Sequence, residues 1–304
     1  MGRGRRAPEA GRIVPPEPTQ VDLHAHTCRS DGLLEPSTLV AAAAAAGVRT
    51  FAIADHDTLA GYRDLVASGA GPLPPGLYLL AGVEINAVAG GLDLPDGELH
   101  VVGLGVDPAD DVFEAALAKQ RGWRRRRFER MAARLRAAGL GVDPQLAGLD
   151  LARDDALGRP TLARALVAAG FARSVQDAFE RFVGRGGPGY VPREGLGPVQ
   201  AIRAIRGAGG IPVLAHFSVA PSRRVLLREL MEAGLVGLEV HHRSFDAATV
   251  AAVGAVARDL GLLPSGGTDF HGDDETYAEA LGETWVPAEI AAGVLAALRV
   301  GIVA

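Results

Sequence analysis

The sequence has a single cysteine, Cys28, and lacks long apolar runs. One cysteine excludes a disulfide within the chain, which fits a reducing cytoplasm, and we predict that location. No apolar stretch approaches the roughly 20 residues that cross a bilayer, so we predict no membrane association. A formal net charge of −5 gives no sign of bulk nucleic-acid binding.

The sequence also lacks internal repeats of the 20–50-residue kind that build solenoids and propellers. Residues 1–19 hold arginine, glycine and proline without the apolar core of a signal peptide, and we predict a disordered tail there. The remaining length fits one large domain, or one domain with an inserted subdomain.

Short apolar runs recur from Val21 onward, and each leads into an acidic residue or a histidine before a helix-like stretch follows. Runs of this kind, bounded by Gly and Pro, indicate buried strands, and their alternation with helices indicates an α/β barrel or a doubly wound sheet. In a barrel, polar residues at the carboxyl ends of strands meet at one mouth. The polar residues at these positions are His24, His26, Asp55, His56, Asp57, Glu84, His100, His216, His241, Asp269 and His271.

The segment 111–192 interrupts this alternation, because it contains no convincing strand pattern. Residues 112–138, 161–169 and 174–183 have helical spacing instead. We therefore predict that 20–110 and 193–304 form the two parts of a barrel. The helical insertion 111–192 would cover the mouth of that barrel.

The polar residues at the strand ends are better explained together than singly. His24 and His26 lie one residue apart on a strand, so they point to the same face. Asp31, Asp55 and Asp57 would each suit a turn or a helix cap if taken alone. However, buried charges are unfavourable and histidine is not a favoured core residue, so the whole set predicts bound cations. Imidazole with carboxylate suits manganese, zinc or iron better than magnesium or calcium alone.

These motifs resemble those of the PHP family, named for polymerase and histidinol phosphatase. The opening motifs are Val21–Thr27, Ser30–Gly32 and Ile53–Thr58, and the later ones follow in the family's order at Gly82–Glu84, Leu99–Gly103, Leu214–His216 and Gly267–His271. The resemblance covers roughly Val21 to Ala304. Two motifs in the helical block, Gly158–Pro160 and Gly189–Pro192, resemble the branch of nucleoside 3′,5′-bisphosphate phosphatases and 5′→3′ exoribonucleases.

The resemblance implies a distorted (β/α)7 barrel that holds two to three divalent metal ions, with manganese our first choice and zinc or iron as alternatives. By motif, one metal would take His24, His26, Glu84 and Asp269. A second would share Glu84 and add His100 and His216. A third would take Asp31, His56 and His271.

The resemblance also implies hydrolysis of a phosphomonoester, because such cations neutralise the phosphate and activate water. We predict catalytic roles for Glu84, His216 and Asp269. A bisphosphate has a second phosphate, and arginine binds phosphate through two hydrogen bonds. For substrate binding we select Arg159, Arg173, Tyr190 and Arg193.

Other polar residues favour plainer interpretations. The run Arg124–Arg127 spreads around a helix, so a solvated face is expected rather than a funnel for RNA, although Arg121, Arg124, Arg127 and Arg134 could share one face. Asp93, Asp96 and Glu98 lie in a glycine-rich hairpin and are expected to be exposed. His241 and His242 are expected to line the mouth without binding metal. Cys28 is expected to be a small filler rather than a ligand or nucleophile.

Three functions remain open from the sequence. The first is a phosphatase for a nucleoside 3′,5′-bisphosphate that also trims short RNA from its 5′ end. The second is a phosphatase for another small phosphomonoester such as histidinol phosphate, and the third is a metal-binding module without turnover. The partners expected are a small phosphorylated substrate, a nucleotide or a short RNA end, with no stable protein partner.

Overall fold

The computed structural model describes residues 19–67, 73–90, 97–147, 157–272 and 275–300. The predicted tail lies outside the described residues apart from its last position, Thr19. That residue is 3% exposed, and its hydroxyl donates a hydrogen bond of 3.2 Å to the carbonyl of Thr284. Thr19 is therefore packed against the folded domain. Asp93 and Asp96 lie outside the described residues.

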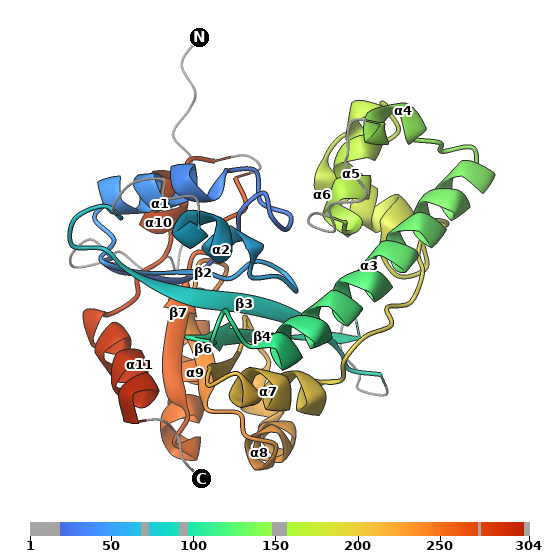
Figure 1. The fold of residues 1–304 in the computed structure, drawn as a ribbon. Coiled ribbons are helices and arrows are strands. Elements are labelled where there is room, and N and C mark those ends of the chain that lie inside the picture. The colour runs from blue at the N-terminus through green and yellow to red at the C-terminus, as the bar shows by residue number, and fades with distance from the viewer. Residues whose placement is uncertain (1–18, 68–72, 91–96, 148–156, 273–274, 301–304) are drawn as a thin grey trace.

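A sheet whose strand order follows the chain forms the centre of the molecule (Figure 1). Its strands are β1 (Val21–Ala25), β2 (Thr50–Ile53), β3 (Tyr78–Val88), β4 (Glu98–Leu104), β5 (Ile211–Leu214), β6 (Gly237–His242) and β7 (Leu263–Gly267). The first strand returns to the last through a bridge between Ala25 and Phe270 and through a 2.7 Å bond from Asp269 N–H to the His24 carbonyl. The sheet is thus a nearly closed barrel, which confirms the predicted α/β barrel.

One strand runs against the others. β4 is antiparallel to both β3 and β5, whereas the other neighbouring strands in the order are parallel. β3 and β4 form the hairpin that the glycines near residue 90 suggested, although 91–96 lie outside the described residues. Regular alternation of strand and helix therefore fails between β3 and β4, and the barrel is distorted, as the resemblance implied.

Helices cover the outside of this barrel, and their ends follow ordinary capping chemistry. The Asp246 carboxylate accepts the Thr249 N–H at 2.7 Å at the start of α9, and Gly261 ends that helix with a φ of 70°. The barrel helices are α1 (Pro36–Ala45), α2 (Ala60–Ala67), α7 (Pro198–Gly207), α8 (Arg224–Glu232), α9 (Ala247–Leu260), α10 (Tyr277–Gly282) and α11 (Ala288–Val300), with the 3₁₀ turn η2 (Ala220–Ser222).

The segment 111–192 contains helices and no strand within its described residues. They are α3 (Asp111–Ala137), α4 (Asp143–Leu146), α5 (Arg159–Ala168), α6 (Val175–Ala178) and the π-helical turn η1 (Phe179–Val183). α3 leans away from the barrel, and α4, α5 and α6 gather near its far end (Figure 1). This group has its own apolar core, which includes Phe128, Leu135, Leu162 and Leu166.

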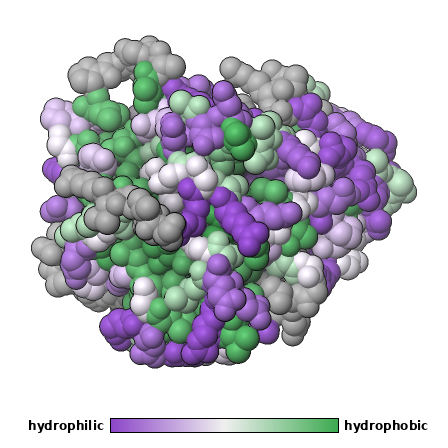
Figure 2. Space-filling view, turned by 60° about the horizontal axis from the view of Figure 1, so that its bottom comes forward, coloured by the Kyte–Doolittle hydropathy of each residue, from purple (hydrophilic) through white to green (hydrophobic). Residues whose placement is uncertain are grey.

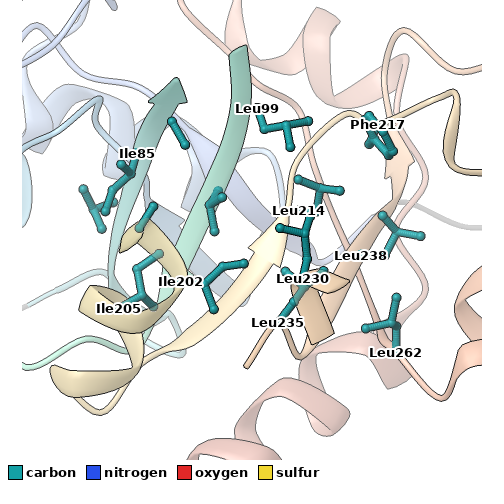
Figure 3. Packing of buried hydrophobic residues seen from close by; sticks show 14 of the residues in the cluster. Ile85, Leu99, Ile202, Ile205, Leu214, Phe217, Leu230, Leu235, Leu238 and Leu262 are labelled. Atoms are coloured by element: carbon teal, nitrogen blue, oxygen red, sulfur yellow. The ribbon is translucent and has the colours of Figure 1, made fainter. Parts of the chain in front are cut away.

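Tight packing between α7 and the sheet fixes β3, β4 and β5. Ile202 and Ile205 of α7 face Ile85 and Leu214 in the main apolar cluster (Figure 3). A Cβ at Gly103 of β4 would lie only 2.9 Å from the Ile205 side chain, so glycine permits this close approach. Rigid strands set the directions of the polar side chains at their ends.

Polar side chains cover much of the surface. Figure 2 shows many hydrophilic side chains on the right of the view, the side on which α3 lies in Figure 1, with others at the centre and bottom and hydrophobic residues toward the centre-left. Within the described part of the chain, none of the helices has the length and apolar character needed to cross a membrane.

Candidate metal centre

The polar residues at the strand ends meet at one mouth of the barrel. Three non-glycine residues here have left-handed backbone angles, with φ of 57° at Asp57, 34° at His216 and 49° at Asp269. Such angles are uncommon outside glycine and persist where surrounding structure enforces them, often at functional sites. All three residues lie within the motifs that the sequence analysis selected.

The first group of potential ligands includes two fully buried histidines, His24 and His26. The His26 Nε2 atom is 3.2 Å from Asp269 Oδ1 and 3.4 Å from Glu84 Oε2, and His24 Nε2 is also 3.4 Å from Glu84 Oε2. One donor atom from each of His24, His26, Glu84 and Asp269 lies within 4.8 Å of the others, a spacing that a single ion can span.

The second group shares Glu84 with the first. The Oε1 atom of Glu84 lies 2.9 Å from His100 Nδ1 and 3.1 Å from His216 Nε2. Because Oε2 faces the first group and Oε1 faces the second, the two oxygens of one carboxylate can bridge two ions. The Glu84 side chain is 1% exposed.

The third group lies on the other side of His26. The Asp31 carboxylate is 3.1 Å from His271 Nε2 and 3.6 Å from His56 Nε2. His26 belongs to this group as well, which the motif comparison did not imply. Together the three groups include all nine residues that the sequence selected as metal ligands.

The hydrogen bonding fits these residues to a metal. Within the described residues, several buried side-chain nitrogen and oxygen atoms have no hydrogen-bond partner, although buried polar atoms are normally satisfied. They include His24 Nε2, both ring nitrogens of His26, and Asp31 Oδ1. An ion would supply the missing partner. The mixed imidazole and carboxylate set suits first-row transition metals.

The charges in the cluster shift one another strongly. Burial alone would lower the pKa of His24, but Glu239, Glu84 and Asp269 outweigh it and raise that pKa well above its usual value. For His26, burial and the nearby His271 lower the pKa to about 3. Burial would favour the neutral form of Glu84, yet the surrounding imidazoles hold its pKa well below the ordinary range. The carboxylates are therefore ionised and ready to bind cations.

Two carboxylates that the sequence analysis did not select hold the centre from behind. Glu239 Oε1 lies 3.0 Å from His24 Nδ1, and its Oε2 accepts the His216 N–H at 2.6 Å. Asp22 accepts hydrogen bonds from the hydroxyls of Thr268 and Tyr277, each at 2.7 Å. Outer carboxylates of this kind orient ligating histidines. The signal was present, since an acid within an apolar strand needs a partner.

Asp55 fixes the loop that carries Asp31. Its carboxylate accepts the backbone N–H and the hydroxyl of Thr27 and the hydroxyl of Ser30, each at 2.7 Å. Burial raises the pKa of Asp55, and these hydrogen bonds oppose that effect. Asp55 thus acts on loop geometry and stands outside the three ligand groups.

The expectation of a solvated arginine run is wrong for two of its members. Arg124 is 7% exposed and donates to Asp57 Oδ2 at 2.7 Å and to Asn86 Oδ1 at 2.6 Å. Arg127 is 6% exposed and donates to the Val191 carbonyl at 2.8 Å. Arg124 therefore ties the helical segment to the barrel, whereas the Arg127 bond links α3 to the end of the same segment. Arg126 is exposed, as expected.

Glu98 was expected to be exposed, and this was also wrong, because its side chain is 3% exposed. Its carboxylate lies 2.9 Å from Arg193 Nε, 3.8 Å from Arg159 and 3.9 Å from Arg127. Burial opposes ionisation of Glu98, but Arg193, His100 and Arg159 outweigh it and hold its pKa well below normal. We call Arg127, Arg159 and Arg193 the arginine cluster.

Tyr190 joins the arginine cluster, whereas Arg173 does not. The Arg127 guanidinium lies 5.9 Å from the centre of the Tyr190 ring. Arg173 is 89% exposed at the start of α6, and its guanidinium pairs with Asp177 at 3.1 Å. Of the four residues selected for substrate binding, the structure brings together Arg159, Tyr190 and Arg193.

The expectation for the histidine pair is confirmed for one member and wrong for the other. His242 Nε2 is 3.4 Å from Asp269 Oδ2, so it lines the mouth, whereas His241 packs edge-on against Trp285, beside residues of α9 and α11. Cys28 lies outside the three ligand groups, and its Sγ donates to Glu35 at 3.1 Å. Burial raises the pKa of this thiol to about 11, which disfavours a nucleophilic role at neutral pH.

A barrel whose mouth gathers such a cluster is the architecture of a metal-dependent hydrolase, and comparison with known proteins agrees. The PHP domain model matches residues 22–125. The 3′,5′-nucleoside bisphosphate phosphatase of Chromobacterium violaceum is 33% identical over 84% of this chain and 88% of its own. The 5′-3′ exoribonuclease Rnm of Escherichia coli is 35% identical over 88% of this chain and 90% of its own.

A solved structure shows the same fold. A protein of Bifidobacterium adolescentis described as a metal-dependent phosphoesterase superposes with a TM-score of 0.78 at 33% identity, covering 92% of this chain and 97% of that one. The chain therefore belongs to the PHP family. It is a metal-dependent hydrolase that acts on phosphoric esters.

Proposed function

We propose that this enzyme releases the 3′-phosphate of a nucleoside 3′,5′-bisphosphate and trims short RNA from its 5′ end. The observation that carries the proposal is a pair of neighbouring anion sites. One is the metal centre and the other is the arginine cluster. His100 stands between them, with Nδ1 2.9 Å from Glu84 and Nε2 3.7 Å from Glu98. Two phosphates on one nucleoside match two such sites, and the relatives' names agree.

The nine residues of the three groups would hold two to three divalent ions in this proposal, with manganese our first choice and zinc or iron as alternatives. Bound there, the ions would neutralise the phosphate and lower the pKa of a water molecule toward about 7. Glu84, whose two oxygens face different groups, would set the spacing of two of the ions. His56 Nδ1 also lies 2.9 Å from Glu84 Oε2, so this carboxylate links all three groups.

Asp269 and His216 are the members best placed to meet a substrate. Their side chains are 24% and 29% exposed, whereas those of His24 and His26 are 1% and 0% exposed. We assign them to the open side, where His216 can pass a proton to the departing O3′ and the ionised Asp269 would help to hold a metal ion against the phosphate. His242 would hold Asp269 in place through its Oδ2 atom, which lies 3.4 Å away.

The arginine cluster would bind the 5′-phosphate. All three guanidinium groups lie within 3.9 Å of the Glu98 carboxylate, so a phosphate that binds beside it would meet several donors held close together. Arg159, Tyr190 and Arg193 are the substrate-binding residues in this proposal. Arg173, paired with Asp177 at the surface, belongs to another part of the molecule.

Phosphate release from defined substrates with added manganese tests the proposal. A nucleoside 3′,5′-bisphosphate should be hydrolysed with a higher kcat/KM than the nucleoside 3′-monophosphate or histidinol phosphate. Arg193→Ala removes a charged contact of about 1.5–3 kcal/mol, so kcat/KM for the bisphosphate should fall roughly 10- to 150-fold. Arg173→Ala is the matched control and should change little.

Two results would favour the other functions. Preference for histidinol phosphate, with no effect of Arg193→Ala, would identify a different small-molecule phosphatase. Metal uptake without hydrolysis of any substrate would identify a binding module. A cytoplasmic location and the lack of a stable protein partner stay predictions.

A further inference from the structure

A cavity of about 430 Å³ lies between the loop that follows β1 and the helices α4 and α5. Its volume falls within the roughly 300–1,000 Å³ typical of small-molecule sites. Asp31 and Leu33 form its wall on the barrel side, and Leu146, Arg164 and Ala168 form part of the wall on the helical side. The helices that bound it lie near the far end of α3 (Figure 1), and Arg164 of α5 contacts the barrel loop at Asp31.

The lining of this cavity suits a nucleoside. Most of the lining area is apolar, and Leu33 leaves 50% of its surface exposed there. Arg164 supplies a planar cation, held by a hydrogen bond of 3.0 Å to the Asp31 carbonyl, and Thr161 supplies a hydroxyl. Flat bases bind between apolar side chains and arginine planes, and hydroxyl or amide groups reach their edges.

A series of contacts joins the arginine cluster to the cavity through the metal centre. From Glu98, contacts lead through His100 to Glu84 at 3.7 Å and 2.9 Å. From Glu84 they continue through His56 to Asp31, at 2.9 Å and 3.6 Å. Asp31 then forms part of the cavity wall. A substrate that extends from the arginine cluster across the metals therefore runs toward the cavity.

We propose that this cavity binds the nucleoside on the 3′ side of the scissile phosphate when the substrate is RNA. The inference rests on the proposed function, which places the 5′-phosphate at the arginine cluster. Water adds to phosphorus, the P–O3′ bond breaks, and O3′ takes a proton. The first nucleoside 5′-phosphate then leaves from the arginine side, and the next nucleotide keeps the phosphate. In a nucleoside bisphosphate the same bond breaks, but nothing occupies the cavity.

Filling the cavity separates these two substrates. Ala168 is an exposed residue at the end of α5 that lines the cavity, so Ala168→Leu adds bulk there without disturbing a core. We expect kcat/KM for a 5′-phosphorylated dinucleotide to fall roughly 10-fold or more. The kcat/KM for the nucleoside bisphosphate should stay within about two-fold of the wild-type value, because this substrate does not occupy the cavity. Ala133→Leu, at an exposed position of α3, is the matched control.

The outcomes separate the inference from the proposed function. Equal loss on both substrates, or no loss on either, overturns the cavity as the nucleoside site while the proposed function stands. Wild-type protein that hydrolyses the bisphosphate but not the dinucleotide also overturns it. Wild-type protein that hydrolyses neither substrate overturns the proposed function and the inference together.

A second measurement needs no substitution, because the single cysteine lines the same cavity. A hydrolysis-resistant phosphorothioate dinucleotide with a 5′-phosphate should slow alkylation of Cys28 at pH 9. The nucleoside bisphosphate should slow it much less. Equal rates of alkylation with the two nucleotides would overturn the assignment.

Discussion

Asp269 combines two properties that few residues of this chain share. Its backbone is left-handed, with a φ of 49°, and its carboxylate meets the first ligand group through Oδ1 while Oδ2 faces His242. Burial would raise the pKa of Asp269, but His271 and His24 outweigh it and hold that pKa well below normal. An ionised carboxylate on the open side of the centre is suited to bind both a cation and the approaching substrate.

Replacement of Asp269 by asparagine keeps the shape of the side chain and removes its charge. We expect phosphatase activity to fall roughly 100-fold or more, in line with the loss of one important electrostatic group. The measurement is phosphate release from a nucleoside bisphosphate, with thermal unfolding as the control for folding. Near-normal turnover with metals still bound would end the assignment of Asp269.

Replacement of Glu239 tests whether the carboxylates that support the ligands contribute to metal affinity. Glu239→Gln weakens the support of His24 and of the His216 backbone, and removal of such support typically lowers metal affinity or activity about 10- to 100-fold. Manganese titration of the variant measures this loss. Glu229→Gln, at an exposed position on α8, is the matched control. Unchanged affinity in the Glu239 variant would show that His24 needs no such partner.

At the scale of the elements, α3 does more than carry the outer helices. Arg124 reaches from it to Asp57, which follows β2, and to Asn86 on β3. Asn86 in turn contacts His100 Nε2 at 2.7 Å. The helical segment therefore contacts and stabilises residues of two strands beside the metal centre. This contact depends on a buried ion pair between Arg124 and Asp57, whose side chains are 7% and 0% exposed.

Arg124→Ala should destabilise the protein strongly, because it leaves the buried Asp57 carboxylate without this cation. Breaking a buried pair from one side typically costs about 3–5 kcal/mol. Urea unfolding monitored by circular dichroism measures the change. Arg126→Ala, two residues along on an exposed face, should stay within about 0.5 kcal/mol of wild type. Equal stability of the two variants would contradict the bracing role of Arg124.

The sequence predicted the elements better than the contacts between them. Apolar periodicity placed α3 within one residue at each end. Periodicity could not show that the Arg124 side of α3 faces a barrel, because that depends on distant residues. Glu98 was missed for the same reason, since only the folded chain brings the arginine cluster around it.

Most of the ligand set was predictable because its residues end or follow strands, and barrel topology brings such positions together. For Asp22 and Glu239 the sequence signalled only that a buried acid needs a partner, and the fold alone shows that these partners include Thr268, Tyr277 and His24. The reversed direction of β4 was only partly visible, through the glycines of its hairpin.

At the scale of the whole molecule, proton binding and metal binding compete for the same groups. Burial lowers the pKa of His100 and of His271. Glu84 outweighs this effect and raises the pKa of His100 to about 9, and Asp31 with Asp269 raises that of His271 to about 10. Because both values lie above the usual 6.5, protonation stabilises the fold fully below about pH 6.5. That stabilisation is lost as the pH rises through 9 and 10.

Metal ions must displace these protons, so metal affinity should rise with pH. We expect manganese to bind more tightly at pH 8.5 than at pH 6.5 and to release protons on binding. Calorimetric titration in buffers of different ionisation enthalpy measures both effects. Affinity that is independent of pH, with no proton release, would contradict the coupling between His100, His271 and the metals.

The central claim is that side chains from six of the seven strand ends and two neighbouring loops act together as one metal centre that hydrolyses a phosphate ester. The rate of phosphate release from a nucleoside 3′,5′-bisphosphate, measured against the number of manganese ions bound per chain, tests it most directly. We expect no turnover in chelated protein and a rise to a plateau at two to three ions. Equal turnover with and without bound metal would contradict it.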